Sequence, residues 1–528
     1  MQLTGEMLIG GRAVRGAVGT MHAVNPATGE AMEPVFGGGS AKDVAAACEL
    51  AEAAFDAYRA VGLEERARFL EAIAQGILDL GDVLVERVMS ESGLPRARVE
   101  GERARTAGQL RMFAALVREG RWLDATIDRA LPERKPLPRV DLRAQKIPLG
   151  PVAVFGASNF PLAFSVGGGD TASALAAGCP VVAKSHPSHL GTSELVGRVI
   201  QKAVKDCGLH EGVFSLVLGE GNAVGEALVL HPAIQGVGFT GSRNGGRALV
   251  ALAAGRDEPI PVYAEMSSIN PVFLLSGALA KRAEMIGSAL IDSVTLGVGQ
   301  MCTKPGVVVG VTGEGFARFR DAAQAAIEAK AATTMLNAGI HRAYCHGTKQ
   351  WEQDAKVRSL TKGSAAAEVG ATAAQAMLFA TTGAHFLASP QLLEEVFGPA
   401  TLLVECGSAD EMVAVAQHFD GQLTAAMHLE EEDGALARTL LPVLERMAGR
   451  VLVNGFPTGV EVAHAMVHGG PQPATSDTRS TSVGAMAIER WLRPVCYQNF
   501  PEALLPEALR DGNPLGIARL VEGKLEQA

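Results

Sequence analysis

The sequence has no long run of basic residues and no long apolar run. Its 528 residues carry a net charge of −10, which argues against a nucleic-acid or anionic-membrane partner because both bind clustered positive charge. No stretch approaches the roughly 18 consecutive apolar residues that a membrane span requires. The first residues also lack the basic and apolar regions of a signal peptide. We therefore expect a small-molecule partner and no membrane.

Cysteine is scarce and dispersed. The seven cysteines form no CxxC pair, so neither a disulfide framework nor a zinc site of common spacing is indicated, and the set is typical of reduced thiols in the cytoplasm. Among the histidines, only His464 and His468 have a ligand-like spacing of four, with Glu461 three residues before His464. No second cluster supplies the remaining ligands, so we expect no metal.

Aromatic residues are also few, whereas glycine is abundant, with 61 copies, as in α/β proteins with close helix–strand contacts. Apolar residues three and four apart predict helices across 41–118. From 151 onward, short apolar runs alternate with helical stretches, and a second such series begins near 307. This alternation predicts two doubly wound parallel sheets. The predicted strands of the first sheet lie near 152–156, 180–184, 213–217, 236–242 and 261–265.

The boundaries follow these changes of pattern. Residues 1–121 and 151–265 are expected to form a dinucleotide-binding domain, and residues 266–483 a catalytic domain. Residues 122–150 are rich in Arg and Pro and predict an arm that pairs with the tail at 484–528. An arm with an exposed strand edge favours a homo-oligomer, a dimer or a tetramer.

Cys302 stands between a glycine-punctuated apolar run and a Lys-Pro turn, in the stretch from Gly299 to Pro305. A thiolate in such a setting can act as a nucleophile. A free cysteine is more often a small buried hydrophobe, and alone this residue would be interpreted in that way. Other polar residues at strand ends favour the catalytic interpretation, because doubly wound folds bind ligands there.

Three of these residues follow or end predicted strands of the first sheet. Asn159 lies between a strand and Phe-Pro, where its amide can point into a cleft or simply form a turn. Lys184, followed by Ser185 and His186, can reach a ribose or phosphate, although a solvated strand-end charge is equally consistent. Glu265 ends an apolar strand, where a carboxylate is costly unless it is paired or functional.

Two further motifs complete the set. Gly241 and Ser242 form a glycine turn at a helix start that suits a pyrophosphate, a weak signal by itself because packing produces similar spacings. Glu395 and Phe397 belong to a Glu-Glu-Val-Phe-Gly-Pro motif. Its acidic pair could equally lie on a solvated helix face.

Together, in this order and spacing, the motifs resemble the NAD(P)-dependent aldehyde dehydrogenase superfamily over nearly the whole chain. Segments such as 184–189, 454–460, 468–471 and 493–497 are similar to the branch that acts on α-ketoglutaric semialdehyde (2,5-dioxopentanoate). Fatty-aldehyde dehydrogenases share part of this pattern. The resemblance implies oxidation of an aldehyde to a carboxylate, here 2-oxoglutarate, through a cysteine thiohemiacetal and thioester.

The resemblance also implies the roles of the catalytic residues. Cys302 attacks the aldehyde, Asn159 and the Cys302 N–H hold the oxyanion, and Glu265 acts as the general base. Two alternative activities remain: oxidation of long-chain fatty aldehydes and thioester transfer to coenzyme A. The presence of Glu265 counts against the transferase, and a non-enzymatic role predicts that one of the three catalytic residues would be missing.

On the cofactor side, the resemblance assigns Lys184, with Ser185 and His186, to the adenosine ribose, and Ser242 with Gly241 to the pyrophosphate. Glu395 and Phe397 are assigned to the nicotinamide ribose. Pro187 stands where NAD-preferring relatives often carry a glutamate, so we expect NADP to be accepted, in addition to NAD or in preference to it. Ser267 and Ser268 replace two glycines common in relatives.

Overall fold

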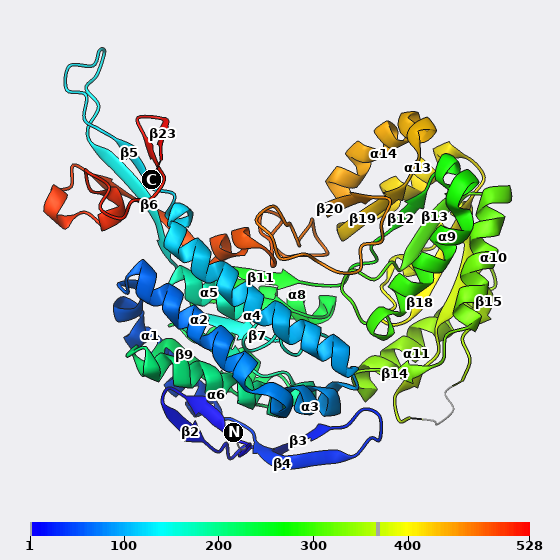
Figure 1. Cartoon of the computed structure of the whole chain (residues 1–528), viewed down its shortest axis with the longest axis horizontal. Helices are drawn as coiled ribbons and strands as arrows, with labels where there is room; N and C mark the ends of the chain where they lie inside the picture. The colour runs from blue at the N-terminus through cyan, green and yellow to red at the C-terminus, as the bar shows by residue number, and fades with distance from the viewer. Residues whose placement is uncertain (1–2, 366–369, 528) are drawn as a thin grey trace.

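The computed structural model describes residues 3–365 and 370–527. The predicted domain ranges also include residues 1, 2, 366–369 and 528, which lie outside the described residues. Two lobes, each built around a seven-stranded sheet, lie side by side, and a smaller five-stranded sheet projects from the first lobe (Figure 1). The α/β fold with two doubly wound sheets and a small β arm is as predicted.

The first sheet has the order β11-β10-β7-β8-β9-β1-β2. The five strands from β11 to β9 in this order are parallel. The short strands β1 and β2 add an antiparallel edge that the sequence patterns did not indicate. The strands are β1 (Met7–Ile9), β2 (Arg12–Val14), β7 (Val152–Phe155), β8 (Val181–Lys184), β9 (Phe214–Val217), β10 (Gly236–Thr240) and β11 (Val262–Glu265).

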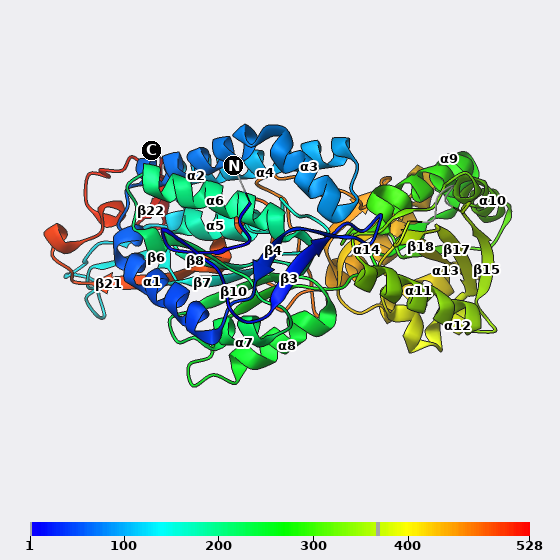
Figure 2. The same ribbon diagram turned by 90° about the horizontal axis from the view of Figure 1, so that it is seen from below.

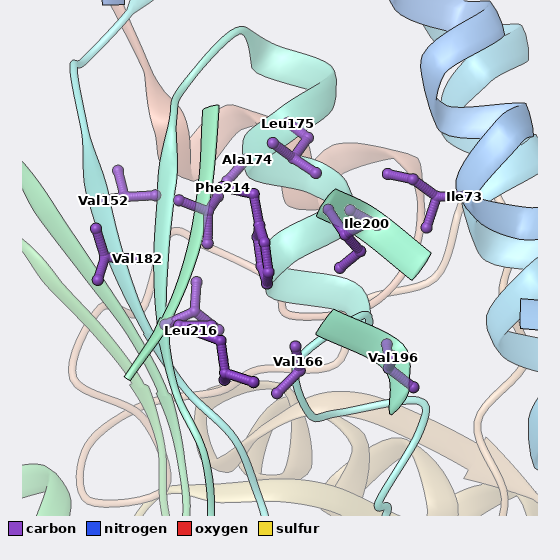
Figure 3. Packing of buried hydrophobic residues seen from close by; sticks show 14 of the residues in the cluster. Ile73, Val152, Val166, Ala174, Leu175, Val182, Val196, Ile200, Phe214 and Leu216 are labelled. Atoms are coloured by element: carbon purple, nitrogen blue, oxygen red, sulfur yellow. The ribbon is translucent and has the colours of Figure 1, made fainter. Parts of the chain in front are cut away.

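Helices cover both faces of this sheet, which explains why its strands are almost continuously apolar. In Figure 3, the Phe214 side chain of β9 points from the sheet toward the helices that carry Leu175 and Ile200. Ile73 belongs to a further helix on the side of these two that faces away from the sheet. Ser40 and Asp43 form a reciprocal capping box that begins the first helix. The helices are α1 (Ala41–Arg59), α2 (Leu63–Asp79), α3 (Gly81–Ser92), α4 (Arg96–Glu119), α5 (Gly169–Ala177), α6 (Leu190–Asp206), α7 (Ala223–Leu230) and α8 (Arg243–Ala254).

The second sheet has the order β15-β17-β18-β13-β12-β19-β20 and is parallel except for β15. Its strands are β12 (Val272–Leu274), β13 (Val307–Val311), β15 (Arg358–Lys362), β17 (Met377–Thr382), β18 (Ala400–Cys406), β19 (Gln422–His428) and β20 (Ala448–Val453). Its helices are α9 (Ser276–Thr295), α10 (Glu314–Glu328), α11 (Ala338–Gln353), α12 (Gly383–Leu387), α13 (Ala409–His418) and α14 (Gly434–Met447).

The arm and the tail form one sheet of the order β21-β6-β5-β22-β23. Strand β21 pairs antiparallel with β6, with Cys496 opposite Ala144. The turned view in Figure 2 also shows this sheet at the end of the molecule away from the second lobe. Its strands are β5 (Thr126–Asp128), β6 (Leu142–Pro148), β21 (Leu492–Gln498), β22 (Arg519–Val521) and β23 (Lys524–Glu526).

Two smaller strand pairs complete the described chain. Strands β3 (Thr20–Val24) and β4 (Ala31–Gly37) form a hairpin, and β14 (Thr333–Thr334) pairs with β16 (Ala373–Ala374). No helix within 3–365 or 370–527 has the length and apolar character needed to cross a membrane.

Candidate active site

Cys302 lies in a tight turn between α9 and β13, and two contacts hold the backbone of that turn. The side-chain amide of Asn270 donates to the Cys302 carbonyl at 2.9 Å and to the Lys304 carbonyl at 3.0 Å. Gly299, at φ +66°, packs so closely on Gly398 that a Cβ would lie 2.3 Å from the Gly398 carbonyl carbon. The turn therefore lies directly against the loop that contains Glu395.

His468 joins the thiol to the buried carboxylate. Its Nε2 lies 3.4 Å from Cys302 Sγ and 3.0 Å from Glu265 Oε1. Ser482 donates to the other oxygen, Glu265 Oε2, at 2.6 Å. Glu265 ends β11, whereas His468 and Ser482 come from the long segment after β20. One sulfur, one ring nitrogen and one carboxylate thus lie within 4.8 Å of one another.

The charges of this group keep the proton on the thiol in the resting enzyme. Burial raises the pKa of Glu265, but the charge of His468 and hydrogen bonds from His468 and Ser482 outweigh it, so the net pKa lies below its ordinary value. Burial and the negative charge of Glu265 raise the pKa of the Cys302 thiol well above its usual range. Cys302 is therefore a thiol at neutral pH, and it needs a base to become a nucleophile.

Asn159 follows β7 and reaches the same turn. Its Nδ2 donates to the Gln300 carbonyl at 3.0 Å, two residues before Cys302. The Asn159 side chain is buried, so few water molecules compete for its hydrogen bonds. An amide has two N–H donors, and one remains for an oxygen that develops negative charge near Cys302.

Sequence reasoning missed the position of His468 in this group. It associated His468 with His464 and Glu461 as an incomplete metal-ligand pattern. The structure buries His468 against Cys302 and Glu265, while His464 and Glu461 are exposed. The spacing of the two histidines could not indicate the contact between His468 and Glu265, because these residues are 203 positions apart.

Lys184, Ser185 and His186 lie together at the carboxyl end of β8. Among the described residues, the Lys184 amine makes only a long 3.5 Å contact, to the adjacent Ser185 carbonyl, and burial lowers its pKa. Burial and the neighbouring charges of His189 and Lys184 hold the pKa of His186 well below its usual range. A partly buried amine with so weak a partner suits a ribose hydroxyl or a phosphate.

Ser242 caps α8, accepting a hydrogen bond from the Gly245 N–H at 3.2 Å. The preceding Gly241 donates its N–H to the Glu265 carbonyl at 3.0 Å, so this helix start adjoins the catalytic strand end. The Nε of Arg243 at the first helical position is buried without a partner in the described part of the chain. These groups fit an anionic pyrophosphate.

Glu395 and Phe397 lie on the loop that packs against the Cys302 turn. Burial raises the pKa of Glu395 to about 7, although Lys304 and a hydrogen bond from Ser267 act in the opposite direction. Burial lowers the pKa of Lys304 to about 8. The Lys304 amine donates to the carbonyls of Val396 at 3.0 Å and Ala400 at 2.8 Å, which fixes the loop near Glu395.

A thiol beside a buried carboxylate and an amide donor, with polar groups at neighbouring strand ends, is an arrangement that suits aldehyde oxidation. The family model "Aldehyde dehydrogenase family" matches residues 14–492. The chain belongs to the aldehyde dehydrogenase family. It is therefore an oxidoreductase that acts on aldehyde groups, and the family uses NAD or NADP.

Two bacterial relatives match this aldehyde dehydrogenase over its full length. It is 59% identical over 527 residues to alpha-ketoglutaric semialdehyde dehydrogenase 2 of Azospirillum brasilense, which covers all of both chains. It is 46% identical over 524 residues to the alpha-ketoglutaric semialdehyde dehydrogenase of Acinetobacter baylyi, which covers 99% of each chain.

Solved structures show the same fold. Aldehyde dehydrogenase C of Pseudomonas syringae, in complex with NAD+ and octanal, superposes with a TM-score of 0.80 at 22% identity. The match covers 95% of this chain and 98% of that one.

Proposed function

We propose that this aldehyde dehydrogenase oxidises 2,5-dioxopentanoate to 2-oxoglutarate with a nicotinamide dinucleotide. The observation that carries the chemistry is the contact of His468 Nε2 with both Cys302 Sγ and Glu265 Oε1. The identity to two α-ketoglutaric semialdehyde dehydrogenases over the full chain supports the substrate.

In the first half of the reaction, the thiol proton of Cys302 leaves toward His468 and Glu265. The sulfur then forms a bond to the aldehyde carbon, and the carbonyl electron pair moves to oxygen. Asn159 and the Cys302 backbone N–H stabilise this oxyanion because they are already oriented where the charge develops. The product of this half is a thiohemiacetal on Cys302.

The second half releases the acid. A bound nicotinamide dinucleotide would supply the hydride acceptor that converts the thiohemiacetal on Cys302 to a thioester. Glu265, held by Ser482 and His468, takes a proton from water as the water oxygen attacks the thioester carbon. The carbon–sulfur bond then breaks, Cys302 regains a proton, and the carboxylate leaves.

Lys184 and Ser242 would hold the adenosine ribose and the pyrophosphate, and Glu395 with Phe397 the nicotinamide ribose. Pro187 presents no carboxylate toward the adenosine ribose, so a 2′-phosphate meets no like charge there and Lys184 can pair with it. NADP is therefore accepted as a cofactor, in addition to NAD or in preference to it.

One observation favours a second candidate, a longer neutral aldehyde. Beside Cys302 lies an apolar cluster that could contact a hydrocarbon chain. Its members are Ala157, Phe160, Ala163, Phe164, Met301 and Val483. An assay of 2,5-dioxopentanoate, succinic semialdehyde and a long-chain aldehyde with both cofactors separates the two functions. A higher kcat/KM for the long-chain aldehyde would refute the proposed substrate.

The arm supports an oligomer. Strand β21 forms one edge of the five-stranded sheet, with most of its residues partly or fully exposed. An unpaired edge favours pairing with another chain, so this edge joins two copies in a homodimer or homotetramer. Light scattering coupled to gel filtration tests this, and a monomer at micromolar concentration would contradict it.

A further inference from the structure

An arginine of α4 reaches across to the segment that carries the active-site histidine. Arg105 donates from Nη1 to the carbonyl of Val460, 355 positions away. Its guanidinium carbon lies 5.7 Å from the ring centre of Phe164, and that ring lies 6.3 Å from the ring of His468. One aromatic side chain therefore separates Arg105 from the group that contacts the reactive sulfur.

The guanidinium of Arg105 has an unused edge. Its Nε and Nη2 are buried and have no hydrogen-bond partner among residues 3–365 and 370–527. These two nitrogens lie on the same side of the planar group, and this edge binds a carboxylate through two parallel N–H···O bonds. Within the same part of the chain, no Asp or Glu forms an ion pair with Arg105.

Two neighbouring arginines differ from Arg105 in their partners. Arg98 also lies over an aromatic ring, 4.5 Å from the centre of Phe160, but its Nη1 donates to Glu102 at 2.8 Å. Arg450 donates both Nη groups to backbone carbonyls of residues 457 and 459, which leaves only its Nε without a partner. Among the described residues, neither has two buried, unpartnered nitrogens on one edge, as Arg105 has.

The surroundings make an unpaired cation costly. Phe164 belongs to the apolar cluster beside Cys302, which also contains Met301. Burial lowers the pKa of Arg105, and this effect is opposed by Glu102 and by the ionised form of Cys302. A buried guanidinium without a carboxylate carries an uncompensated desolvation cost, and an anionic ligand would remove it.

Given the proposed function, we propose that the Nε–Nη2 edge of Arg105 binds the distal carboxylate of the substrate while Cys302 attacks its aldehyde end. The position explains how the apolar surroundings of Cys302 accept an anionic semialdehyde. Phe164 covers the face of the guanidinium and leaves its edge for the carboxylate. Because both nitrogens are covered in the free enzyme, neighbouring side chains shift when the substrate binds.

The test uses two substitutions and a matched control. Arg105→Met keeps the length of the side chain and removes its charge, whereas Arg105→Lys keeps the charge and loses the two-nitrogen edge. Arg103→Met is the control, because Arg103 lies on the same helix and donates to the Gly81 carbonyl instead. Each variant is assayed with 2,5-dioxopentanoate and with pentanal, its neutral five-carbon counterpart, after thermal unfolding has shown that it is folded.

We expect Arg105→Met to lower kcat/KM for 2,5-dioxopentanoate by about 10- to 100-fold, chiefly through KM, since a hydrogen-bonded charge pair is lost. Activity on pentanal should stay within about twofold or rise. Arg105→Lys should recover part of the lost kcat/KM. Arg103→Met should leave kcat/KM unchanged for both aldehydes.

Equal losses for both aldehydes would overturn the proposal, because Arg105 would then act only by holding the segment at Val460. An unchanged KM for 2,5-dioxopentanoate would overturn it as well. Failure of the wild-type enzyme to oxidise 2,5-dioxopentanoate would instead refute the proposed function. Succinic semialdehyde and butanal would then test Arg105 as a matched anionic and neutral pair. If Arg105→Met does not fold, the Arg105→Lys variant decides with the same readouts.

Discussion

Replacing His468 with glutamine tests the proton path from Cys302. Its Nε2 is placed 3.4 Å from the sulfur and 3.0 Å from Glu265 Oε1. Glutamine retains bulk and hydrogen-bonding groups but does not take up a proton at neutral pH. General acid–base catalysis contributes about 10²- to 10⁴-fold. We therefore expect kcat to fall by about this factor, which corresponds to about 2.7–5.4 kcal/mol of activation free energy.

The same substitution should move the pH profile in a defined direction. Burial raises the pKa of Glu265, and His468 is the main group that lowers it. Without His468 the burial effect dominates, so the pKa of Glu265 rises. Glu265 acts as a base only when ionised, and activity is lost as pH falls through its pKa. The acidic limb of kcat/KM should therefore shift to higher pH in the variant.

The assay is initial-rate cofactor reduction over a range of aldehyde concentrations at each pH, which gives both kcat and kcat/KM, in parallel for the wild-type enzyme, His468→Gln and His464→Gln. His464 is exposed and four residues away, so its substitution controls for the loss of a nearby imidazole and should leave both kcat and pH profile unchanged. If His468→Gln kept at least half of the wild-type kcat with an unshifted acidic limb, the proton path through His468 would be refuted.

Three further substitutions test other parts of the site. Asn159→Ala should lower kcat by about 10²- to 10³-fold with little effect on KM, since it removes an oxyanion donor; an unchanged kcat would contradict that role. Asn270→Ala should lower the free energy of unfolding by about 1–3 kcal/mol, because buried carbonyls of the Cys302 turn lose their donor, and denaturant titration measures this loss. Pro187→Glu should lower the NADP-to-NAD ratio of kcat/KM by at least about tenfold, because a carboxylate repels the 2′-phosphate. An unchanged ratio would argue against the cofactor assignment.

Residues whose chemistry depends on their place at a strand end could be predicted from the sequence. Glu265 interrupts an otherwise apolar strand, and a carboxylate there is costly unless it has a function. Cys302 stands in a turn of unusual composition, and the glycine at 299 is explained by its close approach to Gly398. The alternation of apolar runs and helices likewise identified both parallel sheets, because parallel strands are buried on both faces.

Residues whose role comes from contacts across the chain could not be predicted in this way. His468 lies in a segment without regular strands or helices, 166 positions from Cys302, so no periodicity placed it. Arg105 looks like any charged residue of an amphipathic helix, and its contacts with Val460 and Phe164 are what show that it points inward. The antiparallel edges β1, β2 and β15 consist of three to five residues each, too short for a clear pattern.

The most direct test of the account is a coupled measurement of both products from 2,5-dioxopentanoate, with the wild-type enzyme and with Cys302→Ala. We expect the wild-type enzyme to form 2-oxoglutarate and reduced cofactor in equal amounts, and the variant to form neither while still binding the dinucleotide. Full turnover by Cys302→Ala would contradict the thiol mechanism. Absence of 2-oxoglutarate from an otherwise active wild-type enzyme would contradict the substrate.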